Sequence, residues 1–489
     1  MHVNLTSILT ESPIEMFDRI LSWQYYMLRM IGLDGFSKQL SVNILTLGIF
    51  FLASMFMVVS FYDLFVLFRK DLLGKTFVLT TICFGFIGWG RLVNIFTHRN
   101  FLPVLMQMAR ATYVRGTFDR RQTFILEQYT SIYMHGVLLY STVFLVGVII
   151  ASVGPAMIFQ LSGETILPFG VYLPFVDPNS ETGYELNYLY QLSCMLWTPP
   201  GLTATQNIYF ALILNICIQY DVLQLHLEDL NLLIQETSLM TKEQVIAEKL
   251  REIIINQQRL AQFVNSIESV FSIVTIIEVL SMTFQLVLTL FVMRSKLWPP
   301  GIFLIPLCTI QLFIMCVPGT IIDIKASKLT ERMYSVTWHE LHAKNKRIYQ
   351  LLLHRSQHPR CLTCAGMVNM DMHLFMSVVK KVYSITERAL GAVKETVGNC
   401  SVQRDDLRRR INEKYLPLQK FIPTDLKEEL ELLDLSLTSI SATMEDYQTA
   451  YKRTKLIRTD YFTVYDRIKM GIENAEMIIS KHSVDPSEL

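Results

Sequence analysis

Cys361 and Cys364 form the pattern with the clearest potential for chemistry, a CxxC pair with His358 close by. Thiolates and imidazole are ligands of zinc, but a structural zinc site needs four of them and no second pair stands near. Other cysteines lie in apolar segments and are typical of small buried hydrophobes: Cys83, Cys194, Cys217, Cys308 and Cys316. We therefore expect no metal, no cofactor and no catalysis.

Two ionisable residues lie in long apolar stretches. Glu278 is inside Val264–Met293, and Arg91 is near the end of Phe77–Phe96. Ionisable residues at membrane depth are rare and functional by default. Arg91 indicates an interior or interfacial edge of its stretch, whereas Glu278 fits either a wet pocket floor or an inter-helix hydrogen bond.

The composition excludes a purely water-soluble protein. Of 489 residues, 51% are hydrophobic and 18% are charged, with a mean hydropathy of +0.33. Soluble proteins of this size carry about a quarter charged residues. The net charge of +1 and the lack of a basic stripe give no argument for nucleic acid as a partner. Met1 to Leu40 lacks the basic start and short apolar run of a secretory signal, so the first span is expected to act as the insertion signal.

Seven stretches are candidate membrane spans, for which roughly 20 apolar residues are needed. The last one is short, carries Lys380 and Lys381, and fails on hydropathy alone. Gly154 and Pro155 are expected to end the third stretch. The Pro199-Pro200-Gly201 sequence is expected to break the fourth. The stretches are Val42–Phe68, Phe77–Phe96, Tyr133–Ile158, Leu186–Ile218, Val264–Met293, Pro300–Ile322 and Met370–Ile385. The predicted fold class is an all-α integral membrane protein.

Lysine and arginine predict the orientation, because they collect in cytoplasmic loops. The loop Phe159–Glu185 contains neither. The loop between the second and third spans holds five arginines, and the loop after the fourth span and the segment after the sixth hold both lysine and arginine. Arg69, Lys70 and Lys75 indicate the opposite, weakly. The prediction is an N-terminus inside and, after seven spans, a C-terminus outside.

Two cytoplasmic segments have helical patterns. Leu223–Leu260 carries a leucine stripe, and Val336–Leu353 carries an apolar one. These helices are expected to extend the fifth and sixth spans into the cytosol. The pattern leaves open whether they pack on themselves or form a subunit-assembly domain.

The region from Cys316 to Ser384 resembles the C-terminal signature of the insect odorant receptors. LPFVDPNSETGYELNYLYQ is similar to the second outer loop of that family, and the resemblance covers about Ser22 to Ser384. The matching residues are Cys316, Gly319, Ser327, Tyr334, Trp338, Arg347, Leu351, Leu353, Arg355, Gln357, Pro359, Thr363, Ala365, Gly366, Phe375, Lys380, Tyr383 and Ser384, with Pro174, Phe175, Asp177 and Gln191 upstream.

The resemblance implies an odorant-gated, non-selective cation channel, assembled as a heterotetramer with a shared co-receptor in the cell membrane of a sensory neuron dendrite. The implied partners are a volatile odorant, the co-receptor and membrane lipid. The second half of the seventh segment would line the pore, where Lys380 and Lys381 are tolerated. The pore-lining residues are then Phe375, Val378, Val379 and Val382.

The outer halves of the spans supply candidates for the odorant site, because small volatile ligands bind mainly to apolar and aromatic walls. Trp197 is the best of them, since it sits beside the Pro199-Pro200-Gly201 sequence. For each candidate, simple helix packing is the more common role. The candidates are Thr80, Phe84, Phe144, Val148, Ser152, Trp197, Gly201, Met282 and Gln285.

The sequence departs from the family after Ser384. Glu387 and Arg388 stand where an apolar end of the pore is expected, and heptad-like leucines follow from Leu426. The expected domains are a cytoplasmic segment 1–41, a receptor and channel domain 42–386, and a helical, coiled-coil tail 387–489, either a gene-model fusion or a rebuilt pore end. An outside tail would make Asn399 a glycosylation site.

Two other functions remain open. A metabotropic seven-helix receptor would need its N-terminus outside, against the loop charges. A membrane-tethered scaffold would work through the helical tail, which would then have to fold and bind alone.

Overall fold

The computed structural model describes residues 12–34, 41–67, 72–162, 167–177, 180–236, 242–295 and 299–389, together with 391, 402 and 409. The helical tail expected at 387–489 and Asn399 therefore fall almost wholly outside the described residues. Residues 1–286 and 306–382 form one compact unit, and 287–305 with 383–489 form another.

The first unit begins with α1 (Pro13–Met30), which is not a membrane helix. Ser12 caps it, and Glu15 completes a reciprocal capping box. Its buried face packs on α4 (Leu102–Gly116), α5 (Arg120–Ser162) and α6 (Glu181–Gln235). A two-stranded pairing of β1 (Leu33–Asp34) with β2 (Ser41–Val42) follows, with Leu33 opposite Val42. The predicted segment 1–41 thus contains a helix that packs against the bundle.

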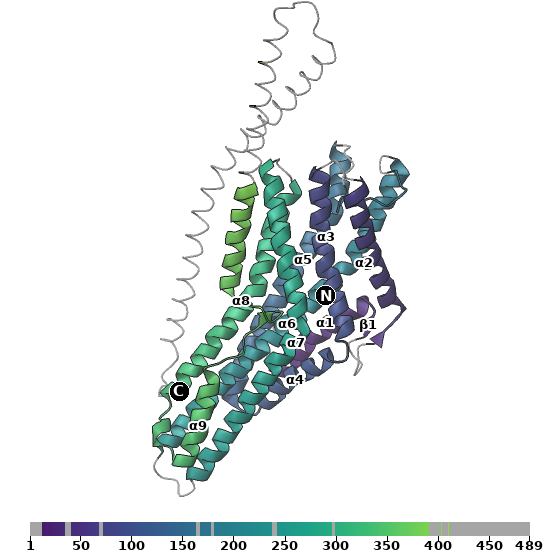
Figure 1. Cartoon of the computed structure of the whole chain (residues 1–489). Coiled ribbons are helices and arrows are strands. Elements are labelled where there is room, and N and C mark those ends of the chain that lie inside the picture. Colours follow the sequence, from purple (N-terminus) through teal and green to yellow (C-terminus); the bar gives the residue numbers. More distant parts are fainter. Residues whose placement is uncertain are drawn as a thin grey trace, which may run out of the picture. The chain divides into compact units, whose positions relative to one another are not determined.

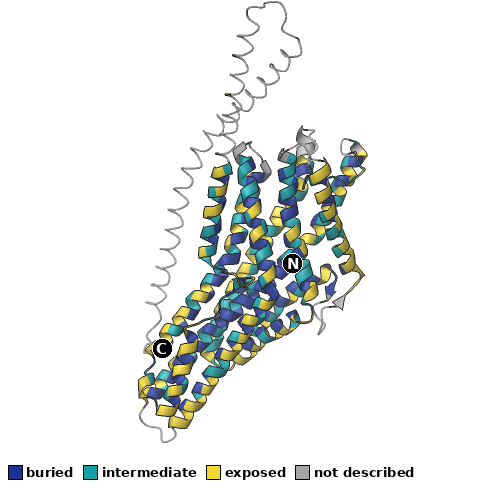
Figure 2. Cartoon of the chain, viewed as in Figure 1, coloured by how far each residue is buried: buried dark blue, intermediate teal, exposed yellow. Residues whose placement is uncertain are grey.

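Six helices of the described residues are long and apolar enough to cross a membrane. They lie in α2 (Ile44–Tyr62) with its π-helical extension η2 (Asp63–Leu67), α3 (Leu72–Thr97), α5, α6, α7 (Lys242–Ser295) and α8 (Pro299–Ser335). A further helix covers residues 372–389. The helical fold with six clear spans and a seventh segment that hydropathy rejects agrees with the sequence prediction. Figure 2 shows exposed residues along these helices, as expected where lipid replaces a protein neighbour.

Two predicted helix breaks are wrong. α5 continues through Pro155 to Ser162, and α6 continues through Pro199 and Pro200. A proline removes one backbone donor but does not end a helix whose other backbone bonds are kept. Two threonines beside the prolines of α6 bond backbone carbonyls of the same helix. Thr198 donates to the carbonyl of Cys194 at 2.7 Å, and Thr203 donates to that of Pro199 at 2.6 Å.

α6, α7 and α8 continue well beyond the length of a membrane span and run side by side towards α9 (Ala343–Ser356), as Figure 1 shows. Ion pairs join them there: Lys325 of α8 lies 2.8 Å from Asp221 of α6, and Lys249 of α7 lies 3.2 Å from Asp229. The extension of the fifth and sixth spans is confirmed by α7 and α8. Leu223–Leu260 is not one helix, because α6 ends at Gln235 and α7 begins at Lys242. The single helix expected at Val336–Leu353 is wrong, because α8 ends at Ser335 and a short 3-10 turn, η3 (Trp338–Glu340), precedes α9.

A small hairpin links α9 to helix 372–389. Its strands are β3 (Thr363–Cys364) and β4 (Val368–Asn369), paired antiparallel with Thr363 opposite Asn369. Cys364 of the CxxC pair lies in β3, and Cys361 lies just before that strand. Within the described residues, no group of His, Cys, Asp and Glu side chains is arranged to hold a metal ion.

Candidate ligand-binding site

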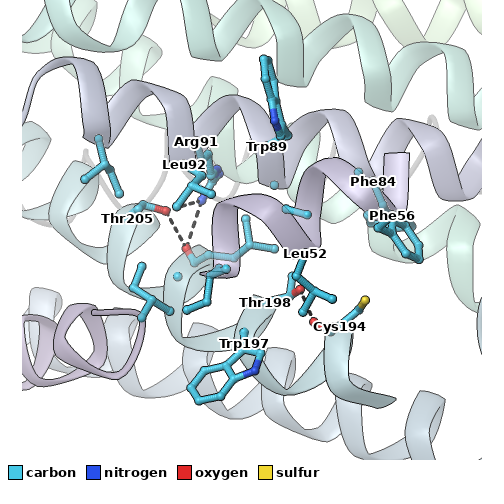
Figure 3. Close-up of a pocket in the computed structure, with 18 of the residues that line it drawn as sticks. Leu52, Phe56, Phe84, Trp89, Arg91, Leu92, Cys194, Trp197, Thr198 and Thr205 are labelled. Atoms are coloured by element: carbon cyan, nitrogen blue, oxygen red, sulfur yellow. Dashed lines mark hydrogen bonds between the residues drawn. The ribbon is translucent and has the colours of Figure 1, made fainter. Parts of the chain in front are cut away.

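A cavity of about 150 Å³ lies among α2, α3 and α6. One face of α2 supplies Ile49, Leu52, Ala53 and Phe56, which follow helical spacing. Ile31, just after α1, reaches it from another side, 3.6 Å from where a side chain on Gly201 would begin. A Cβ at position 201 would make an ordinary van der Waals contact with Ile31, so the packing here does not require glycine. Figure 3 shows aromatic walls from Phe56, Phe84, Trp89 and Trp197.

Arg91 forms one end of the cavity and is paired with Glu278 of α7. Nη2 lies 2.9 Å from Oε2, Nε lies 2.5 Å from Oε1, and both side chains are almost fully buried. The guanidinium also donates to the Leu202 carbonyl at 3.0 Å and to the Thr205 hydroxyl at 3.2 Å, as Figure 3 shows. A further bond goes to the side-chain oxygen of Gln206. These contacts join α3, α6 and α7.

The positive charge of Arg91 is thus fully used within the protein. A guanidinium has five N–H donors. Nε serves Glu278, Nη1 serves Leu202 and Thr205, and Nη2 serves Glu278 and Gln206. A buried charge without such partners would be costly. The cavity consequently presents a neutral, largely apolar wall, with Arg91 contributing packing rather than a free charge.

The threonine hydroxyls of the cavity wall also donate to backbone carbonyls. Thr81 donates to Phe169 at 3.0 Å, Thr198 to Cys194 and Thr205 to Leu202. Each oxygen keeps acceptor capacity after its proton is placed. The polar character that the cavity offers to a ligand therefore comes from a few hydroxyl oxygens and indole edges.

Segment 167–177 contributes Phe169 to the wall of the cavity. Four buried polar side chains from the helices hold its backbone, so we refer to this segment as the lid. Gln191 accepts from the Phe169 amide at 2.8 Å and donates to the Val171 carbonyl at 2.5 Å. The other contacts are Tyr172 N to Asp63 at 2.5 Å, Leu173 N to Asn187 at 2.6 Å, and the bond from Thr81 to Phe169.

Gly170 allows the lid to lie this close to α3. Its φ is +61°, and an added Cβ would overlap the ring of Phe77. A side chain here would meet both a backbone penalty and a steric one.

Three of the ligand-site candidates from the sequence line this cavity: Phe84, Trp197 and Gly201. The others lie elsewhere. Thr80 is buried and donates to the Phe77 carbonyl, and Ser152 of α5 donates to the Val148 carbonyl. Phe144 stacks on Tyr140, while Met282 and Gln285 are buried in α7. Odorant contact by any of the nine stays a prediction.

The four residues predicted to line a pore lie in helix 372–389. Phe375, Val378 and Val382 are buried in the single chain, and Phe375 packs on Phe313 of α8 at 5.7 Å between ring centroids. Val379 is half-buried and is the one of the four with surface left. Pore lining by these residues stays a prediction.

Sequence reasoning missed the face of α2, the lid and the partnership of Arg91 with Glu278. The first has a signal in the sequence, because Ile49, Leu52, Ala53 and Phe56 share one helical face. The pairing of Arg91 with Glu278 also has a signal in the sequence, because two opposite charges inside apolar stretches are expected to meet. The inter-helix alternative for Glu278 agrees with the structure, as an ion pair.

Residues 71–383 match the family model described as the 7tm odorant receptor. The chain belongs to the odorant receptor family. This receptor is 22% identical over 242 residues to the putative odorant receptor 83c of Drosophila melanogaster, covering 47% of this chain. The matched part of this chain spans 61% of the length of that relative. A separate match links 104 residues, 21% of this chain, at 25% identity to 1% of the muscle-specific protein 300 kDa of the same organism.

Solved structures show the same fold for this receptor. The insect olfactory receptor OR5 from Machilis hrabei in complex with eugenol matches with a TM-score of 0.63 and 13% identity, over 77% of this chain and 98% of that one. A second structure of OR5 from Machilis hrabei matches with a TM-score of 0.59 and 12% identity, over 71% of this chain and 89% of that one. The chain thus combines the insect olfactory receptor fold with six helices, among the described residues, that are long and apolar enough to cross a membrane.

Proposed function

We propose that this receptor is the odorant-binding subunit of a ligand-gated, non-selective cation channel and binds one volatile molecule in the cavity beneath the lid. The observation that carries the proposal is the apolar cavity whose single arginine is neutralised by Glu278. Such a site gains free energy from burying apolar surface, at about 25 cal/mol per Å².

The ligand class follows from the same chemistry. A carboxylate would find no unused donor on Arg91, and an ammonium would find no unused carboxylate on Glu278. A neutral aromatic or aliphatic volatile, with at most a hydroxyl or ether to meet the wall hydroxyls, fits best. Charged analogues of the same shape are expected to be weak ligands, because their desolvation is not compensated.

The channel part of the proposal is supported by the family to which the chain belongs and by the extra helix 372–389. In this arrangement the chain works with the shared co-receptor in the dendritic membrane of a sensory neuron, with the N-terminus inside. The extended ends of α6, α7 and α8 with α9 would assemble the subunits.

The test is current recording from cells that express this receptor with the co-receptor, during exposure to a panel of neutral volatiles. Odour-evoked cation currents are expected with the co-receptor and not without it. Currents from this chain alone would contradict the subunit assignment. Second-messenger signals without current would favour a metabotropic receptor.

We also propose that residues 387–489 form a helical segment separate from the receptor domain 42–386. The family match ends at residue 383, and the match to the muscle-specific protein has about the length of the stretch that follows. Circular dichroism of residues 387–489 alone is expected to show helix. A random-coil spectrum would contradict a scaffold role for this stretch.

A further inference from the structure

The β3–β4 hairpin holds a strained turn between α9 and helix 372–389. Ala365 has φ 51° and Gly366 has φ 72°. A positive φ is uncommon for a residue with a side chain, so the surroundings must over-determine this conformation. The hairpin is therefore a fixed connector.

One face of α7 fixes the hairpin. The Thr363 hydroxyl donates to the carboxylate of Glu268, and the Ala365 amide donates to the Ser272 carbonyl at 3.2 Å. Burial raises the pKa of the Cys364 thiol, opposed in part by a hydrogen bond with Thr275. The connector thus meets α7 through a charge-assisted bond, a backbone bond and a buried sulfur.

α8 fixes the other end of the connector, where helix 372–389 begins. The Met372 amide donates to the Thr320 hydroxyl at 2.8 Å, and Asp371 caps the helix through the Leu374 amide at 2.8 Å. The Met370 carbonyl occupies the space where a side chain on Gly319 would lie. Gly319 is thus required for this close approach.

The hairpin contacts and the cavity contact lie on the same stripe of α7. Glu268, Ser272, Thr275 and Glu278 follow each other at spacings of four, three and three, so they share one face. Glu278 holds Arg91 in the cavity, while Glu268 holds the hairpin. At about 1.5 Å per residue, one rigid helix joins contacts about 15 Å apart.

We propose that the bond from Thr363 to Glu268 couples cavity occupancy to helix 372–389, with α7 as the moving element. A ligand that packs against this end of the cavity shifts the Arg91–Glu278 pair as a unit and α7 with it, and the hairpin transmits that movement to the helix. Thr363 is a positioning residue: it touches no ligand and acts through the helix that it holds. This inference rests on the proposed channel function.

The experiment compares Thr363→Val and Thr363→Ser in the full-length receptor with the co-receptor. Valine keeps the volume and removes the donor, whereas serine keeps the donor. Thr117→Val on α4 is the matched control, since that exposed threonine bonds only its own helix at Val114. Two quantities are measured: odorant-evoked current per surface receptor, and odorant binding to the purified receptor.

For Thr363→Val we expect a loss of current sensitivity of about tenfold or more, the scale of a hydrogen bond to a charged group, with odorant affinity within about twofold of wild type. Serine restores the current, and Thr117→Val changes neither quantity. Unchanged current in Thr363→Val, or a parallel loss of affinity, would overturn the inference.

A second variant covers the case in which Thr363→Val does not reach the surface. Glu268→Gln keeps the acceptor but removes its charge, so current sensitivity should fall less than in Thr363→Val while odorant affinity is kept. A variant in which current sensitivity and affinity change together, or neither changes, would overturn the inference. Absence of odorant current in the wild-type receptor with its co-receptor would instead reject the proposed function itself.

Discussion

Arg91 and Glu278 face each other across α3 and α7 as a two-bond ion pair, and both side chains are more than nine-tenths buried. A pair of this kind is expensive to desolvate, and breaking it is more damaging than replacing it. The pair therefore gives the first prediction.

Arg91→Met or Glu278→Met alone should destabilise the receptor by about 3–5 kcal/mol, because each leaves an uncompensated buried charge. The double variant Arg91→Met/Glu278→Met should recover most of that loss. Surface delivery and thermal unfolding of the purified receptor measure both effects. The control is Arg110→Met, whose partner Asp18 and own side chain are 35% and 49% exposed, and which should cost at most about 1 kcal/mol. Additive losses in the double variant would show that the two residues act independently.

Trp197→Ala should shift the odorant dose–response by roughly tenfold or more. An aromatic wall contributes about 1.5–3 kcal/mol of burial to a bound ligand. Trp23→Ala is the matched control, because Trp23 of α1 is 59% exposed and lies outside the cavity wall. Unchanged potency with normal surface expression would assign Trp197 to helix packing.

Gln191→Leu should loosen the lid, because leucine cannot replace the bonds to Phe169 and Val171. With about 0.5–1.5 kcal/mol per hydrogen bond, the amides of residues 167–177 should exchange with solvent about tenfold faster or more. Hydrogen exchange with mass spectrometry measures this. Gln128→Leu, at an exposed position of α5, should leave exchange of the lid unchanged. Equal exchange in both variants would mean that the lid is held by its apolar contacts alone.

Asn399→Gln should abolish a glycosidase-sensitive mobility shift of the full-length chain. After seven spans, Asn399-Cys400-Ser401 would lie outside the cell, while Asn4-Leu5-Thr6 has the same form but would lie inside. The comparison with Asn4→Gln, expected to have no effect, is the control. A surface-delivered receptor with no shift would overturn the proposed topology.

The fold could be predicted further than the site. Apolar length alone locates six spans, and a family resemblance was needed for helix 372–389, whose lysines lower its hydropathy. The prolines Pro155 and Pro199 gave wrong helix ends, because a proline lowers helix propensity locally but the packing of α5 and α6 decides whether the helix continues.

The cavity could be predicted only in part because its walls come from distant segments. Trp197 and Gly201 have a local signal beside two prolines, and Phe84 is an aromatic on an outer half. Phe169 and Ile31 have none, because their contribution depends on how the lid and α1 fold back on the bundle.

Because every N–H of the Arg91 guanidinium is bonded within the protein, the shape of the cavity can change without exposing a charge inside the helix bundle. Substitutions among the apolar wall residues alter the shape that is selected without touching a charge. A substitution that frees one N–H of Arg91 would create affinity for acids but weaken the bundle at the same position. If the proposed cavity binds the ligand, substitutions can therefore alter the ligand shape that it accepts more easily than the ligand charge. Ligands of related receptors are expected to differ in shape far more often than in ionisation.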